Sequence, residues 1–351
     1  MKTRAEQLPI EIWISIFHYL EIHDLFNAFD HLNQYFNSIL ASDHLSFYVH
    51  LEKCDQFYKQ LAFFSPWSNS ILNRIIFLKS STKGRGKYLS QFLHWHGEQF
   101  HRLKSLTIEV HKQELWPNCI EFVKSHSIEY LSLACIPNEI LLEGILSSPG
   151  LYQCRLYFWQ STNSINTYCD INSNIEILYI RLKDDSNPSI TNFLLSHMPK
   201  LKRLEMVGDH VQHYLNPDVC QSSFSFSQLE KLKLLWLRRD MSLDYFERLF
   251  STTPKLKYLS LAIYCHRLNE SFFEHLLHHW WPSFDRIPFI KLRIKCHGLA
   301  RSNLNNEHTI FDNYCREILG RINTRTDVCL DIKWIEENSK THTIQIIIRK
   351  F

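Results

Sequence analysis

Glycine is scarce in this chain, which has only 8 glycines among its 351 residues. At the usual frequency of about 7 %, a chain of this length would hold about 25. Loops that cradle phosphates and the tight turns of dinucleotide-binding folds need glycine, because the backbone must approach the ligand closely. None of the eight forms a GxGxxG or GxxxxGK[ST] motif. The sequence therefore argues against nucleotide enzymes of the Rossmann and P-loop types.

Long apolar runs and paired cysteines are also missing. No run of 18 apolar residues occurs, so we expect no membrane-spanning helix. The opening residues MKTRAEQLPIEI are charged and lack the long apolar region of a secretory signal peptide. The 10 cysteines are scattered between Cys54 and Cys329, and no two have the CxxC spacing. We therefore expect reduced thiols and a location in the cytoplasm, the nucleus or both.

A strong excess of charge is absent as well. The 39 Lys and Arg residues nearly balance the 36 Asp and Glu residues, which leaves a net charge of +3. This balance argues against nucleic acid as a partner of the whole protein. The basic run STKGRGK, Ser81 to Lys87, could contact a phosphate or a nucleic acid, but we interpret it as a solvated loop. Hydrophobic residues make up 45 % of the chain, which is typical of a packed globular protein.

Motifs that carry catalysis are not found. The sequence has no GxSxG, no HExxH and no cysteine motif that suggests an activated thiolate. We expect no catalytic residue, no metal ion and no cofactor. A hydrolase or metalloenzyme built on the histidines between His266 and His297 stays open as an alternative. Its basis is that His275 and His279 stand four residues apart on an expected helix.

What the sequence does contain is a repeat, with apolar residues at positions i, i+3, i+5 and often i+7. In the first copy, LKSLTIEV, these residues are Leu103, Leu106, Ile108 and Val110. The eight copies follow one another at intervals of 23 to 31 residues and begin at Leu103, Ile128, Leu151, Ile175, Leu201, Leu229, Leu256 and Ile287. Each copy predicts a short strand with one buried face. Near the C-terminal end, DVCLDIKW and HTIQIIIRK predict two closing strands.

Helical patterns lie between several of these strands. Apolar residues recur at a spacing of three to four in NEILLEGILSS, SITNFLLSHM, SLDYFERLFSTT and NESFFEHLLHHWW. Each segment begins at a polar residue suited to capping a helix, namely Asn138, Ser189, Ser242 or Asn269. The sequence therefore predicts alternating strands and helices.

The alternating units resemble a leucine-rich-repeat solenoid between about Leu103 and Ile294. The LxxLxL core is well matched, while the asparagine or cysteine that usually follows it is absent, so we expect an irregular array. The resemblance implies an α/β solenoid with parallel strands on a concave side and helices on a convex side.

The first fifty residues differ from the repeats. The segment LPIEIWISIFHYL predicts a helix that starts at Pro9 and is apolar on nearly every side. A domain this small cannot bury all of these side chains against itself, so the excess apolar surface implies a partner. We expect Asp24 to cap a second helix, DLFNAF, and QYFNSIL to form a third.

This segment resembles the F-box. The family's Leu-Pro pair, its spaced apolar residues and its Asp-Leu pair are matched by Leu8, Pro9, Ile12, Ile16, Phe17, Leu20, Asp24 and Leu25. The chain departs from the family at Phe29, Asp30 and His31, where a Val-Cys pair and often a basic residue are usual. An F-box followed by leucine-rich repeats is similar to the substrate-receptor subunits of Skp1–cullin–F-box ubiquitin ligases.

The resemblance implies a non-catalytic adaptor that holds a substrate protein close to the ligase. An F-box at residues 1–50 would bind a Skp1-like adaptor and, through it, a cullin. Residues 51–100 would form a helical linker or an N-terminal cap, and residues 101–351 the solenoid with its closing strands. The residues implied to contact Skp1 are Leu8, Pro9, Ile12, Ile16, Phe17, Leu20 and Leu25.

The strand positions between the leucines should form the concave face, because side chains alternate along a strand. These positions carry seven basic, two acidic and five aromatic residues. Arginine and tyrosine are favoured at protein-binding sites, and basic clusters bind acidic or phosphorylated peptides. We expect substrate to be bound by Arg155, Tyr157, Tyr179, Arg181, Arg203, Lys231, Lys233, Tyr258, Lys291 and Arg293. Alternatively, these are polar positions that water simply solvates.

An alternative hypothesis retains the solenoid fold and rejects the role in a ubiquitin ligase. Under it, the protein is a leucine-rich-repeat scaffold outside ubiquitination, and the helical bundle only caps the open end of the solenoid. This hypothesis predicts a protein with no affinity for Skp1.

Overall fold

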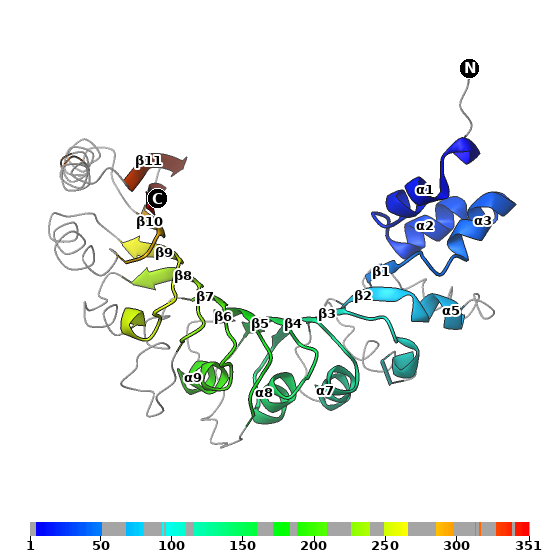
Figure 1. Ribbon diagram of the computed structural model, residues 1–351, viewed down its shortest axis with the longest axis horizontal. Coiled ribbons are helices and arrows are strands. Elements are labelled where there is room, and N and C mark those ends of the chain that lie inside the picture. The colour runs from blue at the N-terminus through cyan, green and yellow to red at the C-terminus, as the bar shows by residue number, and fades with distance from the viewer. Residues whose placement is uncertain are drawn as a thin grey trace. The chain divides into compact units, whose positions relative to one another are not determined.

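A computed structural model describes residues 5–50, 68–80, 93–94, 96–109, 116–159, 171–182, 188–208, 226–238, 249–265, 286–297, 313, 316, 328–338 and 341–350. The chain divides into two compact units, Met1–Arg155 and Leu156–Phe351. Each unit consists of open, mostly parallel strands accompanied by helices, which is a solenoid-like α/β arrangement (Figure 1). The domain boundaries expected near residues 50 and 100 both lie inside the first unit and stay predictions.

The first unit begins with three short helices, which follow the 3-10 turn Ala5–Gln7. They are α1 (Ile10–Phe17), α2 (Ile22–Phe29) and α3 (Gln34–Leu40). Pro9 precedes the first helical residue of α1, in agreement with the expected start. Asn33 caps α3, because its side chain accepts a hydrogen bond from the amide of Phe36 at 3.0 Å.

The expected cap of α2 is wrong. The helix begins at Ile22 with Glu21 in the capping position, so Asp24 lies in its first turn. The physical reason is burial: Ile22 and Leu25 are both in the core, and a helix that starts at Ile22 places both on its inward side. An acidic residue in the first turn still interacts favourably with the helix dipole.

The strands of the first unit run side by side in chain order. They are β1 (Phe47–His50), β2 (Ile75–Ser80), β3 (Ser105–Glu109) and β4 (Tyr130–Cys135), and all neighbouring pairs are parallel. The strand β5 (Gln153–Phe158) crosses the boundary between the units. The expected strands at Leu103 and Ile128 are confirmed, although in each the leading apolar residue lies just before the strand. Neither β1 nor β2 was expected, and β2 falls in the segment interpreted as a helical linker.

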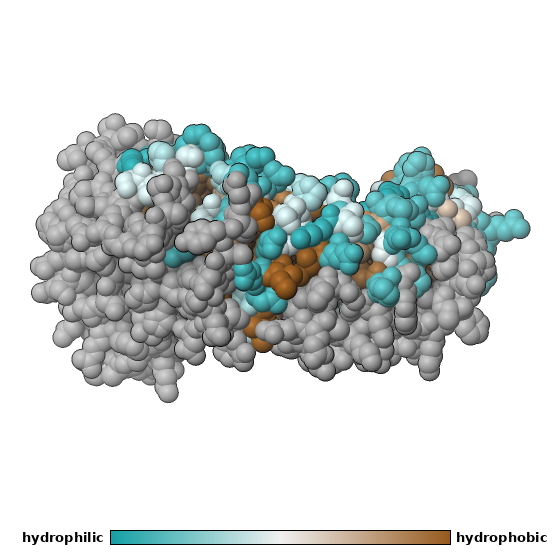
Figure 2. All heavy atoms as spheres, turned by 90° about the horizontal axis from the view of Figure 1, so that it is seen from below, coloured by the Kyte–Doolittle hydropathy of each residue, from teal (hydrophilic) through white to brown (hydrophobic). Residues whose placement is uncertain are grey.

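Helices α5 (Ser68–Asn73), α7 (Trp116–Ser125) and α8 (Glu139–Leu146) complete the described first unit, together with the 3-10 turn Gly97–Gln99. The helices α7 and α8 lie on the same side of β3 and β4 (Figure 1). Asn138 caps α8 as expected, accepting a hydrogen bond from the amide of Leu141 at 2.8 Å. Figure 2 looks onto this side and shows apolar atoms at the surface in the region of α7 and α8, where Ile140 is 67 % exposed.

In the second unit, parallel strands again follow chain order. They are β6 (Ile177–Leu182), β7 (Arg203–Val207), β8 (Lys231–Arg238), β9 (Tyr258–Cys265) and β10 (Phe289–His297). Helix α9 (Pro188–Ser196) lies between β6 and β7 in the chain, as expected, but the expected cap is wrong: the helix already begins at Pro188, so Ser189 lies in its first turn. The two closing strands, β11 (Val328–Asn338) and β12 (Thr341–Lys350), are confirmed. Strand β12 pairs antiparallel with both β10 and β11, which reverses the parallel order.

The same backbone contact recurs where one repeat meets the next. The carbonyl of Lys202, just before β7, accepts the amides of Glu230 and Lys231, and the carbonyl of Glu230 accepts those of Lys257 and Tyr258. This shared contact fixes the lateral register, because each repeat must start level with its neighbour. Leucines of LxxLxL therefore line up across the strands, and Leu204, Leu232 and Leu259 are fully buried in one row. The helical segments expected at Ser242 and Asn269 begin outside the described residues.

Candidate protein-interaction surfaces

The helix α1 and the residues before it expose an apolar face. Leu8, Ile10 and Ile16 are each nearly two-fifths exposed, and Ile12 is 47 % exposed. Tyr19, directly after the helix, is 90 % exposed. Exposed large apolar side chains scattered singly are ordinary, but a group of them on one short helix marks an interaction site. We call Leu8, Ile12 and Ile16 the apolar docking face; Ile10 is exposed as well but lies on the side of α1 that carries Phe17.

The opposite side of α1 packs into an aromatic cluster. The ring of Trp13 lies 4.9 Å from that of Phe36 and 5.6 Å from that of Phe17, and the rings of Phe17 and Phe29 are 4.7 Å apart. Phe29 therefore belongs to the aromatic core that α1 packs against. The apolar docking face stays outward because these aromatic rings hold the inner side of α1.

The seven residues expected to contact Skp1 fall into two groups. Leu8, Pro9, Ile12 and Ile16 are exposed. Phe17 and Leu25 are each only 1 % exposed, and Leu20 is half-buried. The residues Phe17 and Leu25 therefore pack the helices against one another, which leaves the first four to meet a partner directly.

Hydrogen bonds hold the segment before α1 in place. The hydroxyl of Tyr35 donates to the carbonyl of Leu8 at 2.7 Å, and the side-chain Nδ2 of Asn33 donates to the carboxylate of Glu6 at 3.2 Å. Both donors lie at the start of α3. The Leu8-Pro9 pair thus has a defined position against the helices rather than trailing from them.

Arg74 is a buried structural residue that the sequence analysis missed. Its guanidinium donates to the carbonyls of Leu40 and Ser42, both at 2.7 Å, and lies 4.7 Å from the ring centre of Phe47. Burial lowers the pKa of this side chain from its usual value. Arg74 thereby ties the end of α3 to the first strands. The only signal in the sequence is one arginine inside the apolar stretch ILNRIIF.

The second unit carries a basic surface on the outward strand positions. The register places Arg203, Lys231, Tyr258 and Phe289 in one row across β7 to β10. A second row contains Tyr179, Glu205, Lys233, Ser260 and Lys291. A third row ends in Ala262, Arg293 and Gln345. We call this surface the basic strand face.

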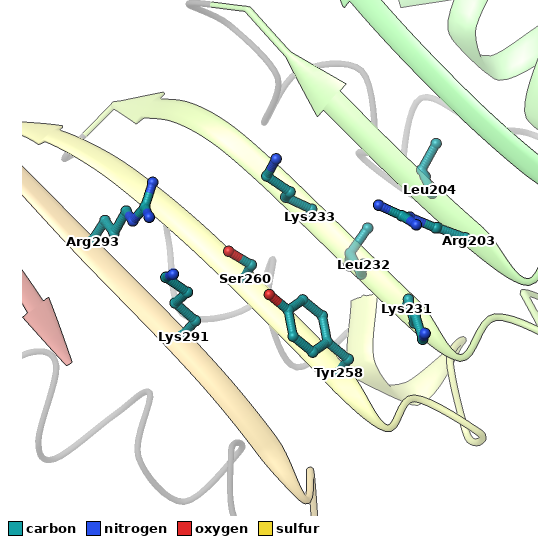
Figure 3. Close-up of a pocket in the computed structure, with 9 residues that line it drawn as sticks. All are labelled: Arg203, Leu204, Lys231, Leu232, Lys233, Tyr258, Ser260, Lys291 and Arg293. Carbon is teal, nitrogen blue, oxygen red and sulfur yellow. The ribbon is translucent and has the colours of Figure 1, made fainter. Parts of the chain in front are cut away.

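Part of the basic strand face is hollowed into a pocket of about 370 Å³ (Figure 3). Its lining brings together six of the ten residues that the sequence predicted for substrate binding, namely Arg203, Lys231, Lys233, Tyr258, Lys291 and Arg293. Leu204, Leu232 and Ser260 complete it. The pocket exists because Ser260 is a short side chain between longer ones, and Figure 3 shows Lys233 and Lys291 on either side of it. We call it the basic pocket.

In the described part of the chain, a single carboxylate, that of Glu205, forms ion pairs with the cations that line the basic pocket. Glu205 pairs with Lys233 at 2.6 Å and lies 3.9 Å from Arg203. Arg293 donates to the side-chain oxygen of Gln345 at 3.4 Å, which is a neutral partner. Burial, followed by the positive charges of Arg293 and Lys233, lowers the pKa of Lys291. The basic pocket thus holds five cationic side chains and an excess of positive charge.

The other four predicted substrate residues lie outside the pocket. The rings of Tyr157 and Tyr179, from β5 and β6, are 5.4 Å apart and form an aromatic platform. Arg181 is exposed two residues further along β6. Arg155 is half-buried and belongs to the first unit, two residues before Tyr157 on β5.

The described residues give little support to a catalytic or metal-binding function. Among those residues no group of three or more His, Cys, Asp or Glu side chains could hold a metal ion. Burial raises the pKa of Cys119 to about 12, and it raises the pKa values of Cys135 and Cys154 as well, which makes these thiols unreactive. The residues His266, His275 and His279, and the run Ser81 to Lys87, lie outside the described residues.

No helix in the described part of the chain is long and apolar enough to cross a membrane. Comparison with known proteins finds no family model that matches the chain and no curated protein with significant sequence similarity.

Proposed function

We propose that this protein is a non-catalytic substrate receptor of a Skp1–cullin–F-box ubiquitin ligase. Its three N-terminal helices are an F-box that binds a Skp1-like adaptor and, through it, a cullin. Its repeats are an irregular leucine-rich-repeat solenoid that binds a substrate protein on the strand face. The work of such a subunit is to raise the effective concentration of substrate near the ligase, so it needs no catalytic residue of its own.

The observation that carries this proposal is the apolar docking face. Ile12 alone is 47 % exposed, and the large apolar side chains of Ile16 and Leu8 are exposed as well. Burying an apolar side chain of this size contributes about 1.5 to 3 kcal/mol. The same helix already buries Phe17 in the core of the unit. The core of the unit therefore does not need the outward apolar residues, and their exposure supports a protein partner.

The proposal is tested by co-purification of the full chain with Skp1. Leu8→Ala combined with Pro9→Ala should abolish the complex, and Ile12→Asp should do the same by placing a charge in an apolar contact. The carbonyl of Leu8 still accepts the hydrogen bond of Tyr35 in the first variant, so the helices keep their anchor.

A matched control is available on α8. Ile140 is 67 % exposed, and Ile140→Asp makes the same chemical change away from the N-terminal helices. This variant should bind Skp1 as the unchanged chain does. If the unchanged chain fails to bind Skp1, the bundle acts only as a cap of the repeats, in line with the way Arg74 and Arg102 attach it to them.

A further inference from the structure

We propose that the basic pocket binds the phosphate of a phosphorylated serine or threonine in an extended segment of the substrate protein, and that an apolar side chain of the same segment lies on the aromatic platform of Tyr157 and Tyr179. The inference deepens the substrate-binding half of the proposed function and rests on it only in calling the peptide a substrate.

The charge of the pocket selects an anion. Five cationic side chains line it, and Glu205 is the one carboxylate among the described residues that pairs with any of them. Neither Lys231 nor Lys291 forms a direct ion pair with an acidic side chain among those residues, although Glu230 lies close enough to interact with the charge of Lys231. Burial lowers the pKa of Lys291, and the neighbouring charges of Arg293 and Lys233 lower it further. A ligand with two negative charges would relieve this repulsion.

The shape of the pocket favours a phosphate over a carboxylate. Lys233, Ser260 and Lys291 stand next to one another on β8, β9 and β10. Neighbouring strands are about 4.8 Å apart, so the backbones that carry the two lysines are about 10 Å apart, with a short side chain between them. Cations approach this space from several directions, as Figure 3 shows. A tetrahedral oxyanion accepts hydrogen bonds from several directions, whereas a carboxylate is planar and has two oxygens.

The surroundings of the pocket favour a peptide over a small free anion. The row that contains Ser260 continues through Lys233 and Glu205 to Tyr179, and the ring of Tyr157 lies against that of Tyr179. This distance is three to four strand spacings, or about 14 to 19 Å. An extended chain advances about 3.3 Å per residue. The platform therefore lies about four to six residues from the phosphorylated one.

The test measures peptide binding to the full chain by fluorescence anisotropy. The probes are synthetic peptides of about twelve residues with one phosphoserine and one phenylalanine, whose separation is varied over a background of alanine and serine. We expect the phosphorylated peptides to bind about ten-fold or more tightly than their unphosphorylated forms. Affinity should peak when the phenylalanine stands about four to six residues from the phosphoserine.

Variants assign the binding to the pocket. Lys291→Met and Arg293→Met should each weaken the phosphorylated peptide about ten-fold and leave the unphosphorylated one unchanged. Ser260→Phe should block the pocket floor. Lys257→Met is the matched control, because Lys257 is an exposed lysine that pairs with Glu230 outside the pocket. Circular dichroism checks that each variant is folded.

Several outcomes would overturn the inference. Equal affinity for phosphorylated and unphosphorylated peptides would do so, as would variants at Lys291 and Arg293 that bind normally. Inorganic tripolyphosphate that binds as tightly as the best peptide would assign the pocket to a small anion. Vesicles with phosphoinositides that capture the chain when peptides do not would assign it to a membrane.

Failure here is separable from failure of the proposed function. The same preparation is tested for Skp1 capture, which uses none of the pocket residues. Peptide binding without Skp1 capture rejects the ligase role alone, and Skp1 capture without phosphate-dependent binding rejects this inference alone.

Discussion

Among the residues that the structure describes, Arg74 is the largest that is fully buried, with an exposed fraction of only 2 %. A guanidinium can occupy such a place because its donors are used. The carbonyl of Leu40, at the last residue of α3, has no partner within the helix, and the carbonyl of Ser42 lies just beyond the helix end. A cation at the C-terminal end of a helix also interacts favourably with the helix dipole. Arg74 therefore stabilises the junction between the apolar docking face and the repeats.

Arg74→Met should lower the free energy of unfolding of the protein by about 2 to 4 kcal/mol, because it leaves the buried carbonyl of Leu40 and the part-buried carbonyl of Ser42 without their charged donor. Arg102→Met is the matched control. Arg102 is exposed and donates to the carbonyl of Asp43 at 2.9 Å, so its loss should cost about 1 kcal/mol or less. Urea unfolding followed by circular dichroism measures both. An equal loss of unfolding free energy in the two variants would contradict the claim that the buried guanidinium of Arg74 stabilises this junction.

The buried thiols give a second prediction at this scale. Because the pKa of Cys119 is raised to about 12 in the folded protein, the folded chain keeps a proton that the unfolded chain loses near pH 8.5. The stability that Cys119 contributes is thus complete below about pH 8.5 and is lost as the pH rises toward 12. Cys119→Ala should make the fall in stability between about pH 8 and pH 11 less steep, as urea unfolding at each pH would record.

A thiol reagent offers an independent reading of the same burial. Near pH 8, Cys119, Cys135 and Cys154 should react only as fast as the protein unfolds. Rapid labelling of these three thiols in the native protein, located by mass spectrometry of peptides, would contradict the assignment.

At the scale of elements, the contact between α7 and α8 depends on a glycine. A Cβ atom placed on Gly144 would lie 2.2 Å from Cγ2 of Ile120, which no real contact allows. Ile120 is β-branched and buried, so its methyl group has little freedom to move away. The close approach of these two helices therefore requires glycine at this position.

Gly144→Ala should destabilise the protein by about 1 to 2 kcal/mol, because the overpacking exceeds the roughly 1 kcal/mol that alanine gains in a helix. Ile120→Leu removes the branch that carries Cγ2 while it keeps the volume, so the double variant should recover most of the loss. Thermal unfolding of the two single variants and the double variant measures the coupling. If Gly144→Ala raised the melting temperature, the close contact would be refuted.

Much of the strand pattern was predictable from the sequence, since a buried row of leucines imposes its spacing directly. Aligning the repeats at LxxLxL also predicts which residues of neighbouring strands lie side by side. It therefore predicts that Arg203, Lys231 and Tyr258 form one row. By contrast, β1 and β2, with the sequences FYVH and IIFLKS, lack the LxxLxL spacing and were not expected. Helix α7, which begins with Trp-Pro, was not expected either. The pairing of β12 between β10 and β11 depends on contacts far apart in the chain, which local patterns do not encode.

The candidate site was predictable in part for the same reason. Alternation along each strand places the cations outward, but the pocket depends on which short residue lies between them, as Ser260 does. On α1 the composition shows an excess of apolar side chains, and packing alone decides that Phe17 turns inward while Ile12 and Ile16 turn outward. Arg74 had no predictive pattern because its partners are backbone carbonyls from another element.

At the scale of the whole molecule, the two proposed binding events use residues of different units. The apolar docking face belongs to the first unit, and the basic pocket belongs to the second. No residue is shared between them. If the proposed function holds, we expect adaptor and substrate to bind independently, so that the adaptor complex forms whether or not substrate is present.

The most direct test of the account is the affinity of the full chain for purified Skp1, measured by isothermal titration calorimetry with and without a saturating phosphoserine peptide. We predict a complex of one chain with one Skp1 and the same affinity, within about two-fold, in both conditions. Ile12→Asp should abolish the heat of binding, while Ile140→Asp should leave it unchanged. If the unchanged, folded chain gives no binding to Skp1, the central claim is wrong.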